Sequence, residues 1–315
     1  MEAVSQLLGH LRREMGKVIV GQEEFRNQCI MALLSRGHAL LEGVPGVAKT
    51  LAVKTLSKLL RLRFQRIQCT SDLMPADIIG TNILNMAKGT FSLHEGPVFA
   101  DILLADEVNR MPPKTQAGLL ECMEERQVTI DGLRRELSPA FTVFATQNPI
   151  EFEGTYPLPE AQLDRFLLKI RVGYPQADEE IELLERTQNG FDACELDSCG
   201  LETVEPEMLA RAQAETRGVK VEQALFAYIT QIIRRTREWP ALSLGASPRA
   251  SVGLMTAAKA AAAMDERDYL IPDDIKDVAP PTLRHRIVLQ PEAGLEGITP
   301  DMVIKEILNC VEVPK

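Results

Sequence analysis

The chain has 315 residues, of which 45% are hydrophobic and 25% are charged, and its formal net charge is −10. This profile is typical of a globular protein with one large or two smaller domains, and it excludes a disordered or fibrous protein. The acidic balance argues against a surface that binds nucleic acid through many phosphate contacts, because such binding needs a dominant basic stripe.

Targeting and membrane segments are not expected. No apolar run reaches the roughly 18 residues that a membrane-spanning helix needs, and the amino terminus lacks the apolar core of a signal peptide. We therefore expect a cytoplasmic protein without a membrane span. The six cysteines are scattered, without a Cys-x-x-Cys pair or a nearby histidine cluster, which favours reduced thiols. Cys194 and Cys199 are the nearest pair, and the same pattern argues against a metal or redox role for them.

The first half of the chain alternates helical and strand-like patterns. Apolar residues recur at helical spacing over residues 2–16 and again from Phe25 to Leu34. Five short apolar runs then follow, with helical patterns between them, which predicts a parallel α/β sheet. The runs cover residues 38–42, 63–69, 101–105, 141–146 and 166–172.

Two hairpins interrupt this order. Asp131-Gly132 lies between residues 127–130 and 133–137, and this dipeptide readily adopts the positive φ values of a tight two-residue turn. A second hairpin is predicted over residues 82–94, with a longer loop at 87–89.

After Pro175 the strand-like runs stop and the apolar pattern takes a 3.6-residue period. This change predicts an α/β domain over residues 1–174 and a helical domain over residues 175–315. The predicted helices cover residues 177–189, 206–216, 221–238, 248–266, 273–279 and 300–310.

A glycine-containing segment, GVPGVAKT, starts at Gly43, after the first apolar run and before a helical pattern. A P-loop requires this context: its backbone N–H groups surround phosphate oxygens, Lys49 would reach the β and γ phosphates of ATP, and the Thr50 hydroxyl would hold Mg²⁺. Ala48 stands where the last glycine of the motif is usual, and a methyl group is tolerated there if φ is negative. The alternative is a turn that only joins a strand to a helix.

Two adjacent acids, Asp106 and Glu107, end the apolar run that starts at residue 101. Open α/β sheets place their ligands at the carboxyl ends of strands. Asp106 would hold Mg²⁺, and Glu107 would polarise the water that attacks the γ phosphate. Alone, the pair would equally suit a helix cap and a solvated charge. A small-molecule kinase has no need of a water-activating glutamate, so the pair favours hydrolysis of ATP over transfer to a metabolite.

Asn148 follows the apolar run 141–146. It would stand beside the γ phosphate if that strand neighbours the P-loop strand, and the alternative is an Asn-Pro turn.

Several long segments together resemble the MoxR family of AAA+ ATPases along nearly the whole chain. They are GVPGVAKT, FSLHEGPVF, LLADEVNRMPPKTQAGLLECMEERQVTIDG, FATQNPIEFEGTYPLPEAQLDRF and ASPRA. The resemblance implies a P-loop NTPase αβα sandwich with a parallel five-stranded sheet, followed by a smaller, all-helical lid domain. It also implies ATP and Mg²⁺ as cofactors. The predicted nucleotide contacts are Val20, Gly21, Gly43, Val44, Pro45, Gly46, Val47, Ala48, Lys49, Thr50 and Leu51.

The resemblance also assigns catalytic roles outside the P-loop. It makes Asn148 the sensor-1 residue, Arg165 the finger that reaches the nucleotide of a neighbouring subunit, and Arg249 the sensor-2 residue of the lid. A guanidinium suits the charge on a transferring phosphoryl group. The alternative for either arginine is a surface ion pair. Arg110 is a further candidate for contact with a neighbour, and an ion pair suits it at least as well.

The family further implies partners. These are a homo-oligomeric ring, expected to be a hexamer, and a protein client, including a protein with a von Willebrand factor A domain. The implied task is maturation of other proteins or insertion of their cofactors. The two hairpins look like the helix-2 insert and pre-sensor-1 hairpin of one AAA+ branch, which often face the pore or the partner; alternatively they only cover sheet edges. A DNA-remodelling motor and a nucleotide-dependent scaffold with little turnover remain rival functions.

Overall fold

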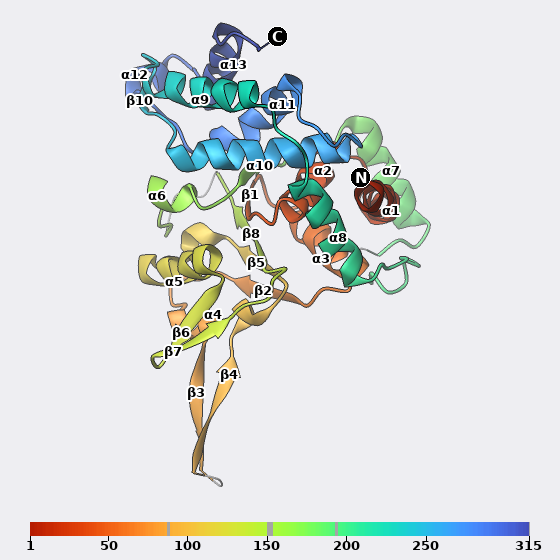
Figure 1. Ribbon diagram of the computed structural model, residues 1–315. Helices are drawn as coiled ribbons and strands as arrows, with labels where there is room; N and C mark the ends of the chain where they lie inside the picture. The colour runs from red at the N-terminus through yellow and green to blue at the C-terminus, as the bar shows by residue number, and fades with distance from the viewer. Residues whose placement is uncertain (87–88, 150–153, 193–194, 315) are drawn as a thin grey trace.

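A computed structural model describes residues 1–86, 89–149, 154–192 and 195–314 (Figure 1). Its central sheet has five parallel strands in the order β2-β5-β8-β1-β9, so the predicted α/β fold is confirmed. The strands are β1 (Ala39–Glu42), β2 (Phe64–Gln68), β5 (Ile102–Asp106), β8 (Thr142–Gln147) and β9 (Leu168–Arg171).

The central strands are apolar because helices cover both faces of the sheet. All five residues of β5 are buried, as are five of the six in β8. The elements of this half are α1 (Glu2–Val18), α2 (Glu23–Leu34), α3 (Lys49–Leu59), α4 (Pro75–Ile79), α5 (Pro113–Glu125) and α6 (Glu160–Leu163), with short 3₁₀ helices at Pro97–Phe99 and Val108–Arg110.

Both predicted hairpins are present. Strands β6 (Gln127–Ile130) and β7 (Leu133–Glu136) pair around Asp131 and Gly132, whose φ values are 49° and 79°. Strands β3 (Gly80–Asn85) and β4 (Thr90–Glu95) form a long ribbon that projects away from the carboxy-terminal helices (Figure 1). Residues 87 and 88 of its predicted loop lie outside the described residues. Asn82 donates a 2.7 Å hydrogen bond to Asp131, so the two hairpins are joined.

The carboxy-terminal part is helical, as predicted, apart from a small antiparallel sheet. Its helices are α7 (Ala177–Gln188), α8 (Pro206–Arg217), α9 (Gln223–Arg237), α10 (Pro248–Met264), α11 (Pro272–Leu283), α12 (Pro291–Leu295) and α13 (Pro300–Cys310). Strands β10 (Leu242–Leu244) and β11 (Val288–Leu289) pair with each other. These strands and α12 were not predicted, because segments of two to five residues are too short to show a period.

The buried core continues from the amino-terminal helices into the carboxy-terminal ones. Glu215 on α8 accepts hydrogen bonds from the first-turn N–H groups of Ala3 (3.2 Å) and Val4 (3.0 Å) on α1. The division of the chain after residue 174 therefore stays a prediction. Among the described residues, no helix combines the length and the apolar character that crossing a membrane requires.

A buried carboxylate fixes α1 to the segment before α8. The Glu14 side chain is 0% exposed and accepts hydrogen bonds from Lys17 (2.6 Å), Arg13 (3.0 Å) and the Glu202 N–H (3.0 Å). Burial alone would raise the pKa of Glu14, but these donors outweigh it and hold the pKa at about 2.

The loop between β1 and α3 curls through two residues in the left-handed region. Gly46 has φ 87°, and Ala48, the residue before the first turn of α3, has φ 58°. The condition of a negative φ at Ala48 is therefore not met, and the motif keeps the backbone shape that glycine usually provides. An L-residue in this region costs roughly 1–2 kcal/mol, and such strain persists where the surroundings of a site enforce it.

The paired state of Glu14 makes stability depend on pH. We expect Glu14→Gln to lower the free energy of unfolding by about 2 kcal/mol near neutral pH, because charged hydrogen bonds are lost. The native pKa lies below the ordinary value of 4.5, so this difference should be complete above pH 4.5 and shrink as the pH falls toward 2. Urea titrations across this range, with the exposed Glu306→Gln as control, check this. A difference that does not change with pH would contradict it.

The strain at Ala48 predicts a stabilising substitution. Ala48→Gly should raise the free energy of unfolding by about 1 kcal/mol, since glycine adopts positive φ without a steric cost. Ala227 lies exposed within α9, so Ala227→Gly should change stability by about 1 kcal/mol in the opposite direction. Thermal or urea unfolding measures both; a loss of stability in both variants would show that Ala48 is not strained.

Candidate functional site

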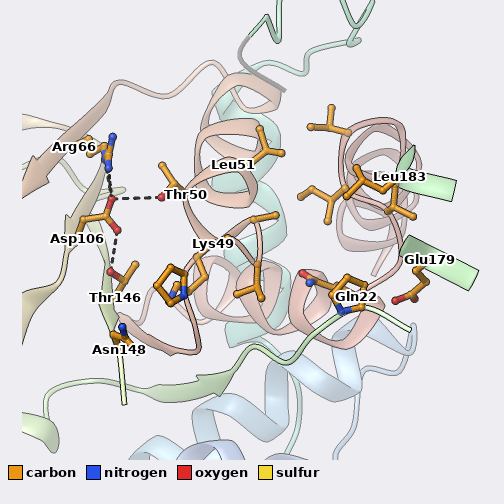
Figure 2. Close-up of a pocket in the computed structure, with 18 of the residues that line it drawn as sticks. Gln22, Lys49, Thr50, Leu51, Arg66, Asp106, Thr146, Asn148, Glu179 and Leu183 are labelled. Atoms are coloured by element: carbon orange, nitrogen blue, oxygen red, sulfur yellow. Dashed lines mark hydrogen bonds and ion pairs between the residues drawn. The ribbon is translucent and has the colours of Figure 1, made fainter. Parts of the chain in front are cut away.

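The carboxyl ends of β5 and β8 and the start of α3 border one cavity of about 510 Å³ (Figure 2). This is the edge of the sheet at which a parallel α/β fold binds ligands. The cavity lining comprises Val18, Ile19, Val20, Gln22, Pro45, Gly46, Val47, Ala48, Lys49, Thr50, Leu51, Arg66, Gln68, Asp106, Glu107, Thr146, Asn148, Pro175, Glu179, Leu183 and Phe191.

Asp106 is the centre of the polar end. Its Oδ2 lies 3.4 Å from the Thr50 hydroxyl and 2.7 Å from the Arg66 guanidinium, and its Oδ1 accepts a 2.9 Å hydrogen bond from Thr146 (Figure 2). The carboxylate is nearly buried and has several donors, so its orientation is fixed.

Glu107 is held by its backbone as well as by its side chain. Its φ of 58° turns the chain sharply after β5, and its N–H donates to the Thr146 hydroxyl at 2.8 Å. The carboxylate accepts a 3.0 Å hydrogen bond from Gln68 and lies 3.2 Å from the Arg110 guanidinium. The left-handed backbone therefore keeps a carboxylate in the cavity beside Asp106. Arg110 contacts this glutamate within its own chain.

The start of α3 is suited to an anion. The first N–H groups of a helix have no partner within the helix, and its dipole favours negative charge there. Lys49 is the first residue of α3, and its ammonium donates to the Gly43 carbonyl, so the cation is held beside the loop. Asn148 follows β8, is 7% exposed, and belongs to the cavity. The prediction for Asn148 required its strand to neighbour the strand before the P-loop, and β8 does pair with β1.

The other end of the cavity carries a group of apolar side chains, with Gln22 and Glu179 nearby (Figure 2). The apolar group comprises Val18, the last residue of α1, with Ile19, Val20, Leu183 of α7 and Phe191. A flat aromatic base suits such a lining, while the phosphates would lie at the polar end. Of this apolar surface, sequence reasoning proposed Val20 only, because the others come from segments brought together by the fold.

Three predicted nucleotide contacts lie outside the cavity lining that the described residues form: Gly21, Gly43 and Val44. A Cβ at Gly43 would lie 2.4 Å from the Val172 carbonyl, so close packing against the end of β9 already requires glycine there. Direct contact of these three with a nucleotide stays a prediction.

The two predicted catalytic arginines lie together, outside this lining. Arg165 Nε is 3.0 Å from one oxygen of Glu124 on α5, and Arg249 Nη1 is 3.1 Å from the other. One carboxylate thus pairs with both guanidinium groups. Their roles at a nucleotide stay predictions.

Arg66, Gln68 and Thr146 were missed by sequence reasoning. Arg66 and Gln68 lie two residues apart on β2, so they share one face of that strand, and Gln68 is in register with Asp106. The alternation of polar residues in β2 was the available signal. Thr146 precedes the Gln-Asn pair and was treated only as part of an apolar strand.

The oxygens of Thr50 and Asp106 fit Mg²⁺. A hydroxyl and a carboxylate are hard ligands, and Mg²⁺ commonly takes one or two protein oxygens together with waters and phosphates. These two residues would hold the ion at the phosphate end of the cavity.

Cys69, which lies close to the site, is not a reactive group. Cys69 follows β2, and burial, together with the charges of Asp106 and Glu107, raises the pKa of its thiol to about 12. Cys199 lies 3.7 Å from the Glu195 carbonyl, and Cys194 falls outside the described residues. Over the described ranges, no group of three or more His, Cys, Asp or Glu side chains is arranged to hold a metal ion.

Comparison with known proteins gives this geometry a family context. Residues 38–168 match the family described as "ATPase family associated with various cellular activities (AAA)", and residues 234–307 match an AAA lid domain. The Bacillus subtilis protein YeaC is 46% identical, over 99% of this chain and 97% of YeaC. Chaperone MoxR1 of Mycobacterium tuberculosis is 45% identical, over 96% of this chain and 81% of MoxR1.

A more distant relative and a solved structure agree. Protein MoxR of Methylorubrum extorquens is 31% identical, over 96% of this chain and 94% of that protein. A crystal structure of a protein from Cytophaga hutchinsonii is 43% identical, covers 100% of this chain and 98% of its own, and superposes with a TM-score of 0.90. The fold, the site and these relatives together show that the chain belongs to the MoxR family of AAA ATPases.

Proposed function

We propose that this protein hydrolyses ATP in the cavity beside α3 and uses the energy to remodel other proteins as a chaperone. The observation that carries the proposal is the meeting of Thr50, Asp106, Glu107 and Asn148 at the amino terminus of a helix. A helix start that binds phosphate, oxygens for Mg²⁺ and a separate carboxylate for water are the parts that phosphate hydrolysis requires.

Each residue has a distinct task in the proposed reaction. Lys49 and the N–H groups of α3 bind the β and γ phosphates, and bound Mg²⁺ would neutralise part of their charge. Glu107 accepts a hydrogen bond from the attacking water and directs its lone pair at the γ phosphorus, while Asn148 orients that water. As the new O–P bond forms, the bond from the γ phosphorus to the β–γ bridging oxygen breaks, ADP leaves, and the proton of the water passes to Glu107. The hydrogen bond from Gln68 keeps the Glu107 carboxylate in place.

Arg165 completes the reaction from a neighbouring subunit. Its side chain is 28% exposed, and its guanidinium is held by Glu124, outside the lining of the cavity of its own chain. In the proposed arrangement it stabilises the charge that develops on the γ phosphate next door. Arg249 pairs with the same Glu124 carboxylate and therefore lies beside Arg165. Hydrolysis then depends on assembly of a ring, which we propose is a hexamer.

The proposed biological role follows from the relatives. The name of the M. tuberculosis relative, Chaperone MoxR1, supports a protein client. We propose that the client is matured or loaded with a cofactor in the cytoplasm, and that a von Willebrand factor A domain protein takes part. The β3–β4 ribbon carries exposed Met86, directly after β3, and exposed Phe91 in β4, and it would contact the client. The predicted domain boundary after residue 174 would separate the ATPase domain from a lid domain that moves during the ATP cycle.

Three single variants test the chemistry. Lys49→Ala, Glu107→Gln and Arg165→Ala should each abolish measurable ATP hydrolysis, and a trans arginine alone is worth about 10³–10⁵ in rate. Glu107→Gln should still bind ATP, because only the group that activates water is lost. Phosphate release and nucleotide binding are measured side by side, with Arg211→Ala on the exposed face of α8 as a control that keeps full activity. Equal rates for the wild type and Glu107→Gln would remove the mechanism.

Mixing two inactive variants tests the trans role of Arg165. Glu107→Gln subunits cannot hydrolyse but can donate Arg165, whereas Arg165→Ala subunits retain Glu107 but lack the finger. A mixture of the two should hydrolyse ATP, because some interfaces unite an intact Glu107 with an intact Arg165. An inactive mixture, under conditions in which the two variants assemble together, would contradict the trans role.

A further inference from the structure

The backbone around Arg165 is fastened to the carboxy-terminal helices. Asp164, the preceding residue, accepts a 2.7 Å hydrogen bond from the hydroxyl of Ser247, which precedes α10. The other oxygen of Asp164 lies 2.8 Å from Nε of Arg286, which follows α11. Two separate parts of the lid thus bind one carboxylate, next to the proposed arginine finger.

The carbonyl groups on both sides of Arg165 are bound as well. Arg286 Nη2 donates to the Phe166 carbonyl at 2.8 Å and to the Asp164 carbonyl at 3.2 Å. His285 Nε2 lies 2.9 Å from the same Phe166 oxygen. A carbonyl only accepts hydrogen bonds, so His285 carries its proton on Nε2. The segment 164–166 is therefore attached to the lid through backbone and side chain together.

Burial makes this attachment stiff. The Arg286 side chain is 3% exposed and that of Asp164 is 18% exposed. Removing one partner of a buried ion pair leaves an uncompensated charge, so the pair resists separation. Burial lowers the pKa of Arg286 to about 10, with Asp164 opposing the shift, and the guanidinium therefore stays charged at neutral pH.

A glycine on α10 leaves room for the guanidinium. A Cβ at Gly253 would lie 2.8 Å from Arg286 Nη1. Gly253 is interior to the helix, where glycine is about 1 kcal/mol less favourable than alanine. Its presence there is explained by the space that Arg286 occupies.

The side chain of Arg165, by contrast, faces the ATPase part of the molecule. Its guanidinium pairs with Glu124 on α5 at 3.0 Å. The finger thus has its backbone on the lid and its guanidinium against the sheet domain. A shift of the lid relative to α5 would change where the guanidinium can reach.

We propose that Asp164, Ser247 and Arg286 form a clamp by which the lid of one subunit positions Arg165 at the nucleotide of the next. These are positioning residues and do not touch the nucleotide. The lid position, set by the nucleotide of one subunit, then determines hydrolysis in its neighbour. This inference rests on the proposed trans role of Arg165.

The donor and acceptor mixture separates positioning from folding. In donor subunits, which carry Glu107→Gln, adding Arg286→Leu should lower the restored rate about tenfold or more, because small displacements of a catalytic group are costly. The KM for ATP should stay the same, since ATP is hydrolysed in the other subunit. In acceptor subunits, which carry Arg165→Ala, the same substitution should leave the restored rate within about twofold, because no finger remains there to be positioned.

Two matched controls sharpen the experiment. Arg284 is another lid arginine with a 9% exposed side chain; it pairs with Asp301 and donates to the Lys169 carbonyl, outside the segment 164–166. Arg284→Leu in the donor should preserve most of the restored rate. The milder Ser247→Ala, which removes one hydrogen bond to Asp164, should reduce the rate in the donor only. Ser243 is a lid serine that donates to the Val288 and Leu289 carbonyls, and Ser243→Ala should leave the rate unchanged.

Several outcomes overturn the clamp. Equal losses with Arg286→Leu in donor and acceptor would mean a role in folding or assembly alone, and so would equal losses from Arg284→Leu and Arg286→Leu. No loss from Arg286→Leu or Ser247→Ala in the donor would show that the finger is positioned by other contacts. If the parent mixture without clamp substitutions is inactive, the trans role of Arg165 fails and the clamp falls with it.

Discussion

The site depends on one carboxylate, Asp106, at the carboxyl end of the buried strand β5. One of its oxygens is shared by Thr50 from α3 and Arg66 from β2, and the other is bound by Thr146 from β8. Because Thr146 also accepts the N–H of Glu107, the same network sets the path of the chain after β5. Elements that are distant in sequence are therefore fixed around the position where phosphate and magnesium would lie.

Local patterns in the sequence were sufficient for most of the fold. The five apolar runs became the five parallel strands, and Asp131-Gly132 formed the expected turn, because strand burial and turn chemistry are short-range signals. The site residues Lys49, Thr50 and Asp106 were also found this way. The apolar end of the cavity was largely not, since Leu183 and Phe191 approach Val18 only through tertiary packing. Ala48 shows another limit of local patterns. The motif identified this residue, but its positive φ was not predicted, because the surrounding structure sets it.

The arginines connect parts of the chain that are distant in sequence. Arg165 and Arg249 are about eighty residues apart in sequence, and no local pattern indicated that both would bind Glu124. The ion pair of Asp164 with Arg286 is equally long-range. In the proposed mechanism, the lid of one subunit changes position with the nucleotide bound to that subunit. Through these contacts, the lid position controls hydrolysis in the next subunit, so the two nucleotide sites are coupled.

The most direct test of the central claim is a structure of the Glu107→Gln variant assembled with ATP and Mg²⁺. We expect the ion about 2.1 Å from oxygens of Thr50 and Asp106, or joined to Asp106 through one water, with Lys49 on the γ phosphate. We also expect the guanidinium of Arg165 from the adjacent subunit at the same phosphate. A nucleotide bound elsewhere, or an interface that leaves Arg165 far from every phosphate, would contradict it.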